Sequence, residues 1–173
     1  MSRLFGPIMQ NGYVVRDWRA AADHWSRLLG VGPFFAMEHI RFAHCTYRGV
    51  ASDIDMSVAI AYTGELQIEL IEQHNAAPSI YTDFRAAHGE GLQHVGVLVD
   101  ALEPVLALDG WQGRVVQEGA TLVGQRFAYV DVGCHPGGMI ELIEVGTQAR
   151  SAFAYMKEKA SNWDGERPIR IAK

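Results

Sequence analysis

The sequence has little of what marks secreted, membrane-spanning or disulfide-stabilised proteins. Its 173 residues include two cysteines, Cys45 and Cys134, which are too few for a disulfide framework and indicate free thiols in a reducing compartment. No apolar stretch is long enough to cross a bilayer, and the first residues lack the apolar core of a signal peptide. We therefore expect a cytoplasmic protein that does not insert into a membrane.

Positive charge is also scarce. Fifteen lysines and arginines stand against 20 aspartates and glutamates, and the formal net charge is -5. No basic stripe runs along the chain, which argues against nucleic acid as a partner. Hydrophobic residues make up 49% and charged residues 20%, as in an ordinary globular protein. The length predicts one compact domain, or two small modules that share a core.

A repeated pentapeptide is the strongest internal signal. Ile-Glu-Leu-Ile-Glu occurs at residues 68–72 and again at 140–144, each time after glycine. Each copy predicts a β-strand, because Ile and Leu suit a half-buried pleated surface. In a strand, the first glutamate of each copy, Glu69 or Glu141, points away from the mainly apolar face. A carboxylate among apolar neighbours costs free energy unless it has a partner, so the matching positions suggest a shared partner.

A second repeat precedes each copy of the pentapeptide. Residues 10–15 and 94–99 share a polar residue, a glycine two places on, and then a β-rich run. The two repeats occur in the same order but with different spacing, as expected of an old internal duplication.

The pattern predicts β-α-β-β-β in each half. In the first half we expect a helix that Asp17 caps and Gly30 ends, with Trp18, Trp25 and Leu28 in the core. The strands expected there are 8–15, 34–40, 54–62 and 66–72, while residues 41–47 stay unassigned. In the second half, a short helix at 79–87 that Ser79 caps precedes the first strand. The other elements expected are strands 92–99, 115–116, 127–132 and 139–145, and helices near 101–108 and 152–159.

The stretches 10–17, 29–34, 92–97 and 138–142 resemble the vicinal-oxygen-chelate superfamily, and most closely its bacterial glyoxalase-like and methylmalonyl-CoA-epimerase-like proteins. The resemblance covers roughly residues 8–145. It implies an α+β fold in which paired βαβββ modules curl a mixed sheet into a cup.

We expect one such domain over residues 1–146, with module one at about 7–74 and module two at about 90–146. The C-terminal helical extension, 147–173, is expected to pack back on the domain or on a second subunit. Small cups of this family often pair, so a homodimer is also expected.

The resemblance further implies that four matching positions bind one divalent cation. Residue by residue, they fall on Gln10, Glu69, His94 and Glu141. An amide oxygen, an imidazole and two carboxylates suit Zn, Co, Ni, Mn or Fe. The set is closer to the glyoxalase I arrangement than to the epimerases, which usually have histidine at the Gln10 position. Ring-cleaving dioxygenases hold iron with two histidines and a glutamate, and one of those histidines is absent here.

Each candidate also has an ordinary structural interpretation. Gln10 could be a surface residue, His94 a structural histidine, and the glutamates edge charges. Gln67 shares the face of Glu69 and is a candidate substrate-binding residue or a solvated one. Tyr129 is the second candidate for substrate binding. His74 and His135 fall in predicted turns and are expected to be exposed.

These residues predict a divalent-metal-dependent isomerase, epimerase or lyase of glyoxalase type that acts on a small carbonyl compound. A metal that grips carbonyl oxygens stabilises the enolate formed when a proton leaves the adjacent carbon. Glu141, and then Glu69, are the candidates for the general base and acid. No basic cluster is evident for a CoA phosphate.

The alternative is a metal-free protein that sequesters a planar hydrophobic ligand, and an Fe(II) dioxygenase is less expected. Aromatic residues that could line such a cup are Phe34, Phe35, Tyr62, Phe127 and Tyr129.

Overall fold

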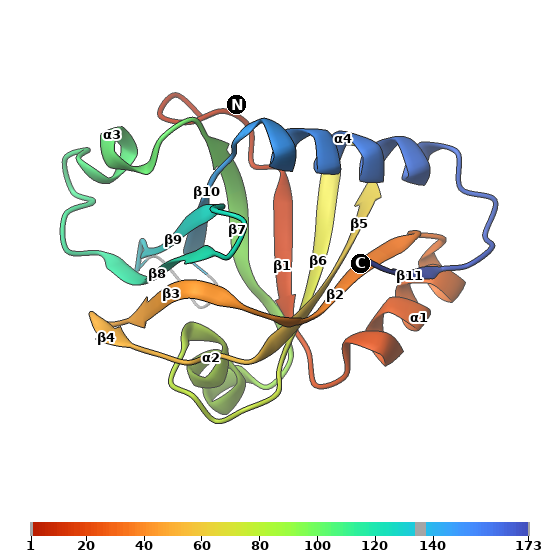
Figure 1. Ribbon diagram of the computed structural model, residues 1–173, viewed down its shortest axis with the longest axis horizontal. Coiled ribbons are helices and arrows are strands. Elements are labelled where there is room, and N and C mark those ends of the chain that lie inside the picture. The colour runs from red at the N-terminus through yellow and green to blue at the C-terminus, as the bar shows by residue number, and fades with distance from the viewer. Residues whose placement is uncertain (1, 134–137, 173) are drawn as a thin grey trace.

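A computed structural model describes residues 2–133 and 138–172 of the chain. Within these residues, eleven strands form one mixed sheet that is bent into a cup, with helices around it (Figure 1). The strand order is β11-β2-β5-β6-β1-β7-β10-β9-β8-β3-β4. The predicted α+β class with a curled mixed sheet is confirmed.

Each half contributes four strands in the same arrangement. The first unit consists of β1 (Gln10–Val14), β2 (Phe34–Ile40), β5 (Met56–Thr63) and β6 (Leu66–Gln73). The second consists of β7 (Gly91–Val99), β8 (Val115–Thr121), β9 (Arg126–Asp131) and β10 (Met139–Glu144). In both units the first strand pairs in parallel with the last, and β1 pairs antiparallel with β7 where the units meet. The last strands of the two units therefore flank the central pair.

Residues 41–47, which the sequence pattern left unassigned, connect the two rims of the cup. They form β3 (Phe42–Tyr47), which together with β4 (Val50–Ala51) adds to the far edge of the second unit. Arg41 alone separates β3 from β2, yet β3 pairs with β8 while β2 pairs with β5. The β2–β3 ribbon thus crosses from one wall to the other (Figure 1). Pairing with β3 also explains why β8 is longer than its predicted two residues.

The helix caps follow the sequence. Asp17 accepts a hydrogen bond from the backbone N–H of Ala20 at the start of α1 (Trp18–Leu29), and Gly30 ends the helix with φ 64°. Ser79 forms a capping box at the start of α2 (Ile80–His88). The placement of Leu28 in the core is wrong, since Leu28 is 71% exposed. It lies about 80° around the helix from the buried Trp18 and therefore misses the sheet.

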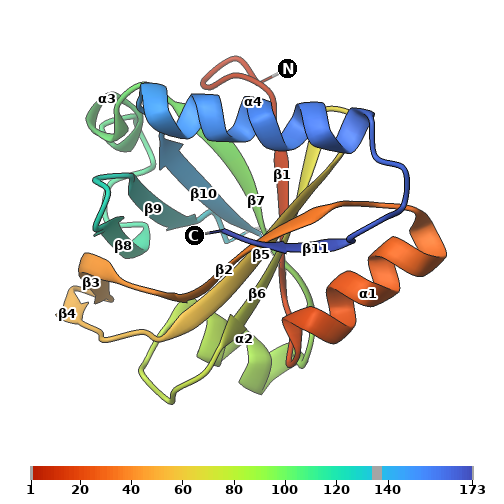
Figure 2. The same cartoon turned by 45° about the vertical axis from the view of Figure 1, so that its right-hand side comes forward.

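Alternation along the strands separates a convex from a concave core. Ile68 and Leu70 pack with Trp18 under α1 on the convex side, whereas Ile71 faces the concave cluster. Figure 2 shows α1 along the outside of the first unit. Phe34 belongs to the convex cluster, so it has the ordinary role of a strand core residue and does not line the cup, as the sequestration alternative would need.

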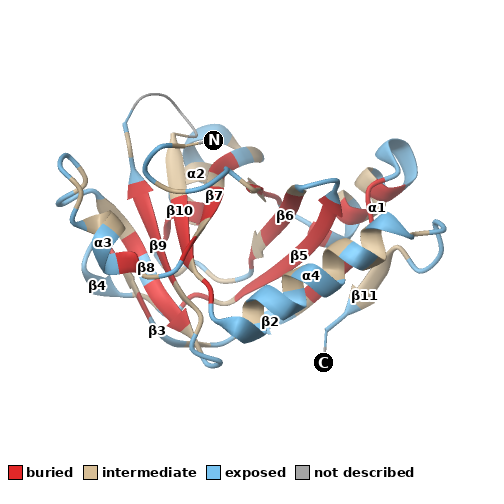
Figure 3. Cartoon of the chain, turned by 90° about the horizontal axis from the view of Figure 1, so that it is seen from above, coloured by how far each residue is buried: buried red, intermediate tan, exposed pale blue. Residues whose placement is uncertain are grey.

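The C-terminal extension packs back on its own chain. Helix α4 (Thr147–Ser161) runs along the rim (Figure 3). Its residues Phe153, Met156 and Ala160 pack against the concave cluster. Strand β11 (Ile169–Ile171) then pairs in parallel with β2. Among the described residues, no helix is both long and apolar enough to span a bilayer.

The second glutamate of each pentapeptide holds a helix on the convex side. Glu72 Oε2 accepts the backbone N–H of Trp18 at 3.0 Å, and Glu144 Oε2 accepts that of Leu102 at 2.9 Å. Leu102 begins the short helix α3 (Leu102–Leu106), whose N-cap, Ala101, offers no side-chain cap. A carboxylate at a helix N-terminus also interacts favourably with the helix dipole. The repeated glutamate therefore does the same structural work in both halves.

We expect Glu144→Ala to lower the free energy of unfolding by about 1–2 kcal/mol, because α3 loses its only side-chain cap among the described contacts. Arg126, 3.0 Å from Glu144, loses an ion-pair partner as well. Chemical denaturation measures the change. Glu118→Ala, which removes an exposed carboxylate on β8, is the matched control and should change stability by less than about 0.5 kcal/mol. Equal losses in both variants would contradict the capping role.

Candidate metal centre

The four predicted site residues lie on the four central strands of the sheet. Glu69 is on β6, Gln10 on β1, His94 on β7 and Glu141 on β10, which are neighbours in that order. Gly12 pairs with Glu69 on one side and with His94 on the other. The pairing positions thus place Glu69 and His94 on either side of one glycine.

A second row repeats this arrangement with the modules exchanged. Gly96 pairs with Gln10 on one side and with Glu141 on the other. A Cβ atom on Gly96 would lie 2.0 Å from Gln10 Oε1, and one on Gly12 would lie 1.9 Å from His94 Cε1. Each glycine therefore makes room for the polar side chain of the other module. This is the physical reason for the repeated pattern of a polar residue followed by glycine two places on.

The side chains converge at one buried point. His94 Nε2 lies 3.3 Å from Glu69 Oε2 and 3.3 Å from Glu141 Oε2. Gln10 and His94 are 1% and 0% exposed, and the two glutamates are 9% and 7% exposed. Water is therefore largely excluded from the cluster.

Four side-chain atoms of this cluster that could act as metal ligands lack a hydrogen-bond partner. Five buried side-chain atoms of the described residues are unpartnered, and four of them are Gln10 Oε1, Glu69 Oε2, His94 Nε2 and Glu141 Oε2. Buried polar atoms without partners cost free energy, so each needs an explanation. Each of the four atoms can offer a lone pair to a cation, and a shared divalent ion would satisfy all of them. The residues present fit a metal.

Two further glutamines hold the candidate ligands in place. Gln67 is fully buried; its Oε1 accepts from Gln10 Nε2 at 2.7 Å, while its own Nε2 donates to Tyr62 at 2.8 Å. The solvated alternative for Gln67 is therefore wrong. Gln93 Oε1 lies 2.8 Å from His94 Nδ1 and, as an acceptor, fixes the proton on that nitrogen. Sequence reasoning missed Gln93, although it directly precedes His94.

Tyr129 forms one wall of the centre. Its ring stands edge-on to that of His94, with centroids 5.1 Å apart, and its hydroxyl accepts a hydrogen bond from Tyr81 at 2.8 Å. Burial raises the pKa of both tyrosines well above 10, so both hydroxyls stay neutral.

Charges inside the cluster shift its protonation. Burial lowers the pKa of His94, but the neighbouring Glu141 and Glu69 outweigh that effect and raise the pKa to about 9. Burial raises the pKa of Glu69, and Glu141 adds to the rise although His94 opposes it. Without a bound cation, a proton on His94 therefore serves as the counter-charge.

A cavity of about 280 Å³ adjoins the centre. It lies between α2 and the second unit, and its lining includes Gln93, which precedes His94, and Met139, which pairs with His94 in the sheet. Arg48 and His88 line it as well. Gln10, Glu69, His94 and Glu141 do not line this cavity, so Gln93 and Met139 are the residues that link it to the centre.

The remaining polar candidates lie elsewhere. His74 is exposed, as expected, and His135 and Cys134 fall outside the described residues. Cys45 is a free, buried thiol. Burial raises the pKa of Cys45 to about 11, so it stays neutral and is a poor nucleophile.

Comparison with known proteins identifies the family. The family model of the Glyoxalase/Bleomycin resistance protein/Dioxygenase superfamily matches residues 9–129. The chain belongs to this superfamily. The predicted resemblance is thus confirmed at the level of the family. A comparison with curated protein sequences finds no match.

Several solved structures share the fold. A methylmalonyl-CoA epimerase from Mycobacterium tuberculosis is similar with a TM-score of 0.59 and 20% identity over 87% of this chain and 95% of its own. A hypothetical protein from Bacillus halodurans has a TM-score of 0.56 and 18% identity, over 82% and 96%. A Streptomyces coelicolor methylmalonyl-CoA epimerase variant in complex with 2-nitronate-propionyl-CoA has a TM-score of 0.52 and 16% identity, over 80% and 94%. At these identities, the similarity establishes the fold alone.

We expect Gly12→Ala to displace the His94 ring and to lower the free energy of unfolding by about 1–3 kcal/mol, the usual cost of overpacking. Denaturation measures the loss, and the NMR shifts of the His94 imidazole report the displacement. Gly6→Ala is the matched control, because a Cβ at Gly6 meets no atom within 4 Å. An undisturbed His94 in Gly12→Ala would contradict the close packing between β1 and β7.

The metal-free protein should become less stable as the pH rises towards 9. The pKa of His94 is about 9 in the folded protein, above its ordinary value of about 6.5. Protonation of His94 therefore stabilises the fold fully below pH about 6.5, and this stabilisation is lost as the pH rises through about 9. The raised pKa of Glu69 acts in the same direction at lower pH. NMR titration of chelator-treated protein measures the His94 midpoint. Glu141→Gln should lower that midpoint, whereas Glu118→Gln should leave it unchanged; equal midpoints would contradict the coupling.

Proposed function

We propose that the protein is a divalent-metal-dependent isomerase or epimerase, with a glyoxalase-type lyase as a related form, that moves a proton beside a carbonyl group. The observation that carries this proposal is the convergence of four unpartnered buried donor atoms on the concave face of the sheet. Membership of the superfamily and the fold shared with epimerases support it.

Gln10, Glu69, His94 and Glu141 would hold the ion, which comes from the group Zn, Co, Ni, Mn and Fe. When bound, the ion would supply Lewis-acid polarisation of a substrate carbonyl oxygen. Gln67 acts through Gln10. The two polar atoms of the Gln67 side chain are hydrogen-bonded to Gln10 and Tyr62, and the bond to Gln10 Nε2 keeps the Gln10 oxygen directed inward. We therefore place Gln67 as a positioning residue rather than in direct contact with substrate.

Two carboxylates are available for proton transfer. We propose Glu141 as the general base that removes the proton from carbon, and Glu69, from the opposite module, as the group that returns a proton. Both carboxylates reach the same histidine nitrogen, so they flank one small volume. Burial of the pair keeps bulk water away from the carbon that loses the proton.

The cavity between α2 and the second unit is the proposed route for the substrate. Its lining includes Gln93 and Met139, the two residues that neighbour His94 along the chain and across the sheet, while the Tyr129 ring packs against that of His94. One neighbouring structure is a methylmalonyl-CoA epimerase in complex with methylmalonyl-CoA. An acyl thioester is therefore one substrate class to test here, beside glutathione-linked carbonyl compounds.

The concave aromatic residues do not favour the alternative of a metal-free sequestration protein. Phe127 and Tyr129 pack against each other with centroids 5.8 Å apart, and Tyr129 accepts a hydrogen bond from Tyr81. These rings fill the core instead of presenting an open face to a planar ligand. A homodimer and a cytoplasmic location stay predictions.

We expect Glu141→Gln to lower the activity at least about 100-fold while the protein stays folded, because the amide cannot accept the proton. The assay follows, by NMR in D₂O, the exchange of the hydrogen on the carbon adjacent to the carbonyl, with methylmalonyl-CoA and a glutathione hemithioacetal as substrates. Elemental analysis of the protein purified without chelator measures the metal.

Glu144→Gln is the matched control, since it changes the other glutamate of the same repeat on the opposite face of β10 and should keep activity. Unchanged exchange in Glu141→Gln would contradict the proposed base. A wild-type protein that neither contains nor takes up a divalent metal would contradict the proposed centre.

A further inference from the structure

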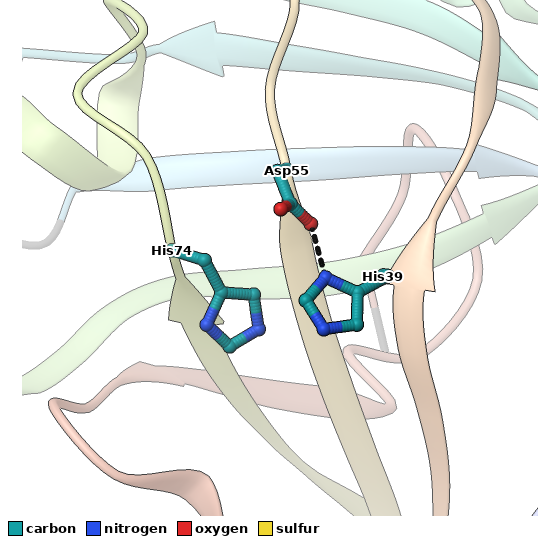
Figure 4. A group of neighbouring side chains, drawn as sticks. All are labelled: His39, Asp55 and His74. Atoms are coloured by element: carbon teal, nitrogen blue, oxygen red, sulfur yellow. Dashed lines mark hydrogen bonds and ion pairs between the residues drawn. The ribbon is translucent and has the colours of Figure 1, made fainter.

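A second group of metal-binding side chains lies outside the centre just described. It consists of His39 near the end of β2, Asp55 immediately before β5 and His74 immediately after β6 (Figure 4). One ring nitrogen of each histidine and one carboxylate oxygen of Asp55 lie within 4.8 Å of one another. Three segments far apart in the sequence thus supply one compact cluster.

The cluster is on the opposite face of the sheet from the proposed catalytic centre. Glu72, which lies 3.3 Å from His74, also accepts the N–H of Trp18 at the start of α1, on the convex side. Glu69, three residues earlier in β6, faces the concave side. The two groups of ligands therefore share no residue and lie on opposite faces of the sheet.

A β-bulge directs His39 into the cluster. Met37 pairs with Val58 and Ile40 with Met56, so two residues of β2, Glu38 and His39, stand opposite one residue of β5. His39 has φ 50°, a conformation that few non-glycine residues adopt. Bulges re-aim side chains, and this one brings the His39 ring to Asp55 and His74.

Hydrogen bonds orient the His74 ring and fix its tautomer. Ser57 Oγ accepts the backbone N–H of His39 at 3.3 Å and lies 2.7 Å from His74 Nε2, so its own proton is available to that nitrogen. His74 Nδ1, 3.3 Å from Glu72 Oε1, then carries the ring proton. A metal ion at Nε2 would take the lone pair that accepts from Ser57, and Glu72 behind Nδ1 is the kind of carboxylate partner found in histidines that bind metals.

The spacing of the ligand atoms suits an ion after a small adjustment. His39 Nδ1 lies 2.8 Å from Asp55 Oδ1, close to the separation of two ligands of one ion. The two rings lie side by side, with centroids 4.7 Å apart (Figure 4). Zinc–nitrogen bonds measure about 2.0–2.1 Å, so closure around an ion needs movements on the order of an ångström. The His39 side chain is 64% exposed and is free to make them.

We propose that His39, Asp55 and His74 bind a transition-metal ion of the class of Zn²⁺, Ni²⁺ or Cu²⁺, with Glu72 orienting His74. Two imidazoles select such ions over Mg²⁺ and Ca²⁺, which take oxygen ligands. Asp55 and Glu72 place two carboxylates beside the imidazoles and so favour a cation. The side chains of His39 and Asp55 are 64% and 43% exposed, so water can reach the remaining coordination positions.

Copper binding tests the site, because the number of nitrogen ligands distinguishes the two clusters. The outer site offers two imidazoles, whereas the inner centre contains one, His94. We expect the full chain carrying His94→Gln and Glu141→Gln to bind one Cu²⁺ and to show electron paramagnetic resonance couplings from two nitrogens. The wild-type chain, stripped with chelator and titrated with Cu²⁺, should show the same two-nitrogen signal.

His39→Asn and His74→Gln should each weaken Cu²⁺ binding at the outer site by at least about 10-fold to 100-fold and remove one nitrogen coupling. Asparagine tolerates the positive φ at position 39, and glutamine can keep a hydrogen bond to Ser57, so both variants should fold. His24→Asn, which removes an exposed histidine of α1, is the matched control and should change nothing.

The proposal is overturned if neither wild type nor the inner-site variant shows a two-nitrogen signal, or if that signal survives His39→Asn. Because the inner-site variant lacks His94 and Glu141, the result does not depend on the function proposed for that centre.

Discussion

The antiparallel contact between β1 and β7 is the constraint on which the rest of the structure depends. It places Gly12 against His94 and Gly96 against Gln10, so each module makes room for a polar side chain of the other. The last strand of each module runs parallel to its first, and this brings the two glutamates to either side of the pair. A slip of one residue would turn all of these side chains to the other face. The register of one strand pair therefore determines whether the centre exists.

The same constraint explains why the pentapeptide is repeated without change. Its first glutamate, Glu69 or Glu141, faces the concave centre, while its last, Glu72 or Glu144, holds the N-terminus of a helix on the convex side. The Ile and Leu residues between them fill both cores. Corresponding glutamates thus face the same side of the sheet in both halves, because the pseudo-symmetry about β1 and β7 repeats the strand arrangement.

The parts that the sequence predicts are those whose pattern is local. Period-two alternation and helix caps identify most strands, both long helices of the core and the faces of Glu69 and Ile71. The crossing of β3 to β8 could not be predicted, because it depends on pairing between residues about 75 apart, with no local signal at either end. Phe34 and Phe35 show a related limit, since two adjacent aromatic residues leave open which one faces the cup. The outer cluster of His39, Asp55 and His74 could not be predicted either, because three segments that are distant in the sequence build it.

Electrostatics separates the two clusters. In the inner centre, Glu69 and Glu141 are almost fully buried, and a proton on His94 compensates only one of their two negative charges. A divalent ion would compensate both and would give partners to four donor atoms at once, so folding and metal binding are coupled there. In the outer cluster, His39 and Asp55 are 64% and 43% exposed, and water already solvates their charges. The inner ligands are thus held in place by the sheet around them, whereas the outer ones depend on a bulge and a few hydrogen bonds.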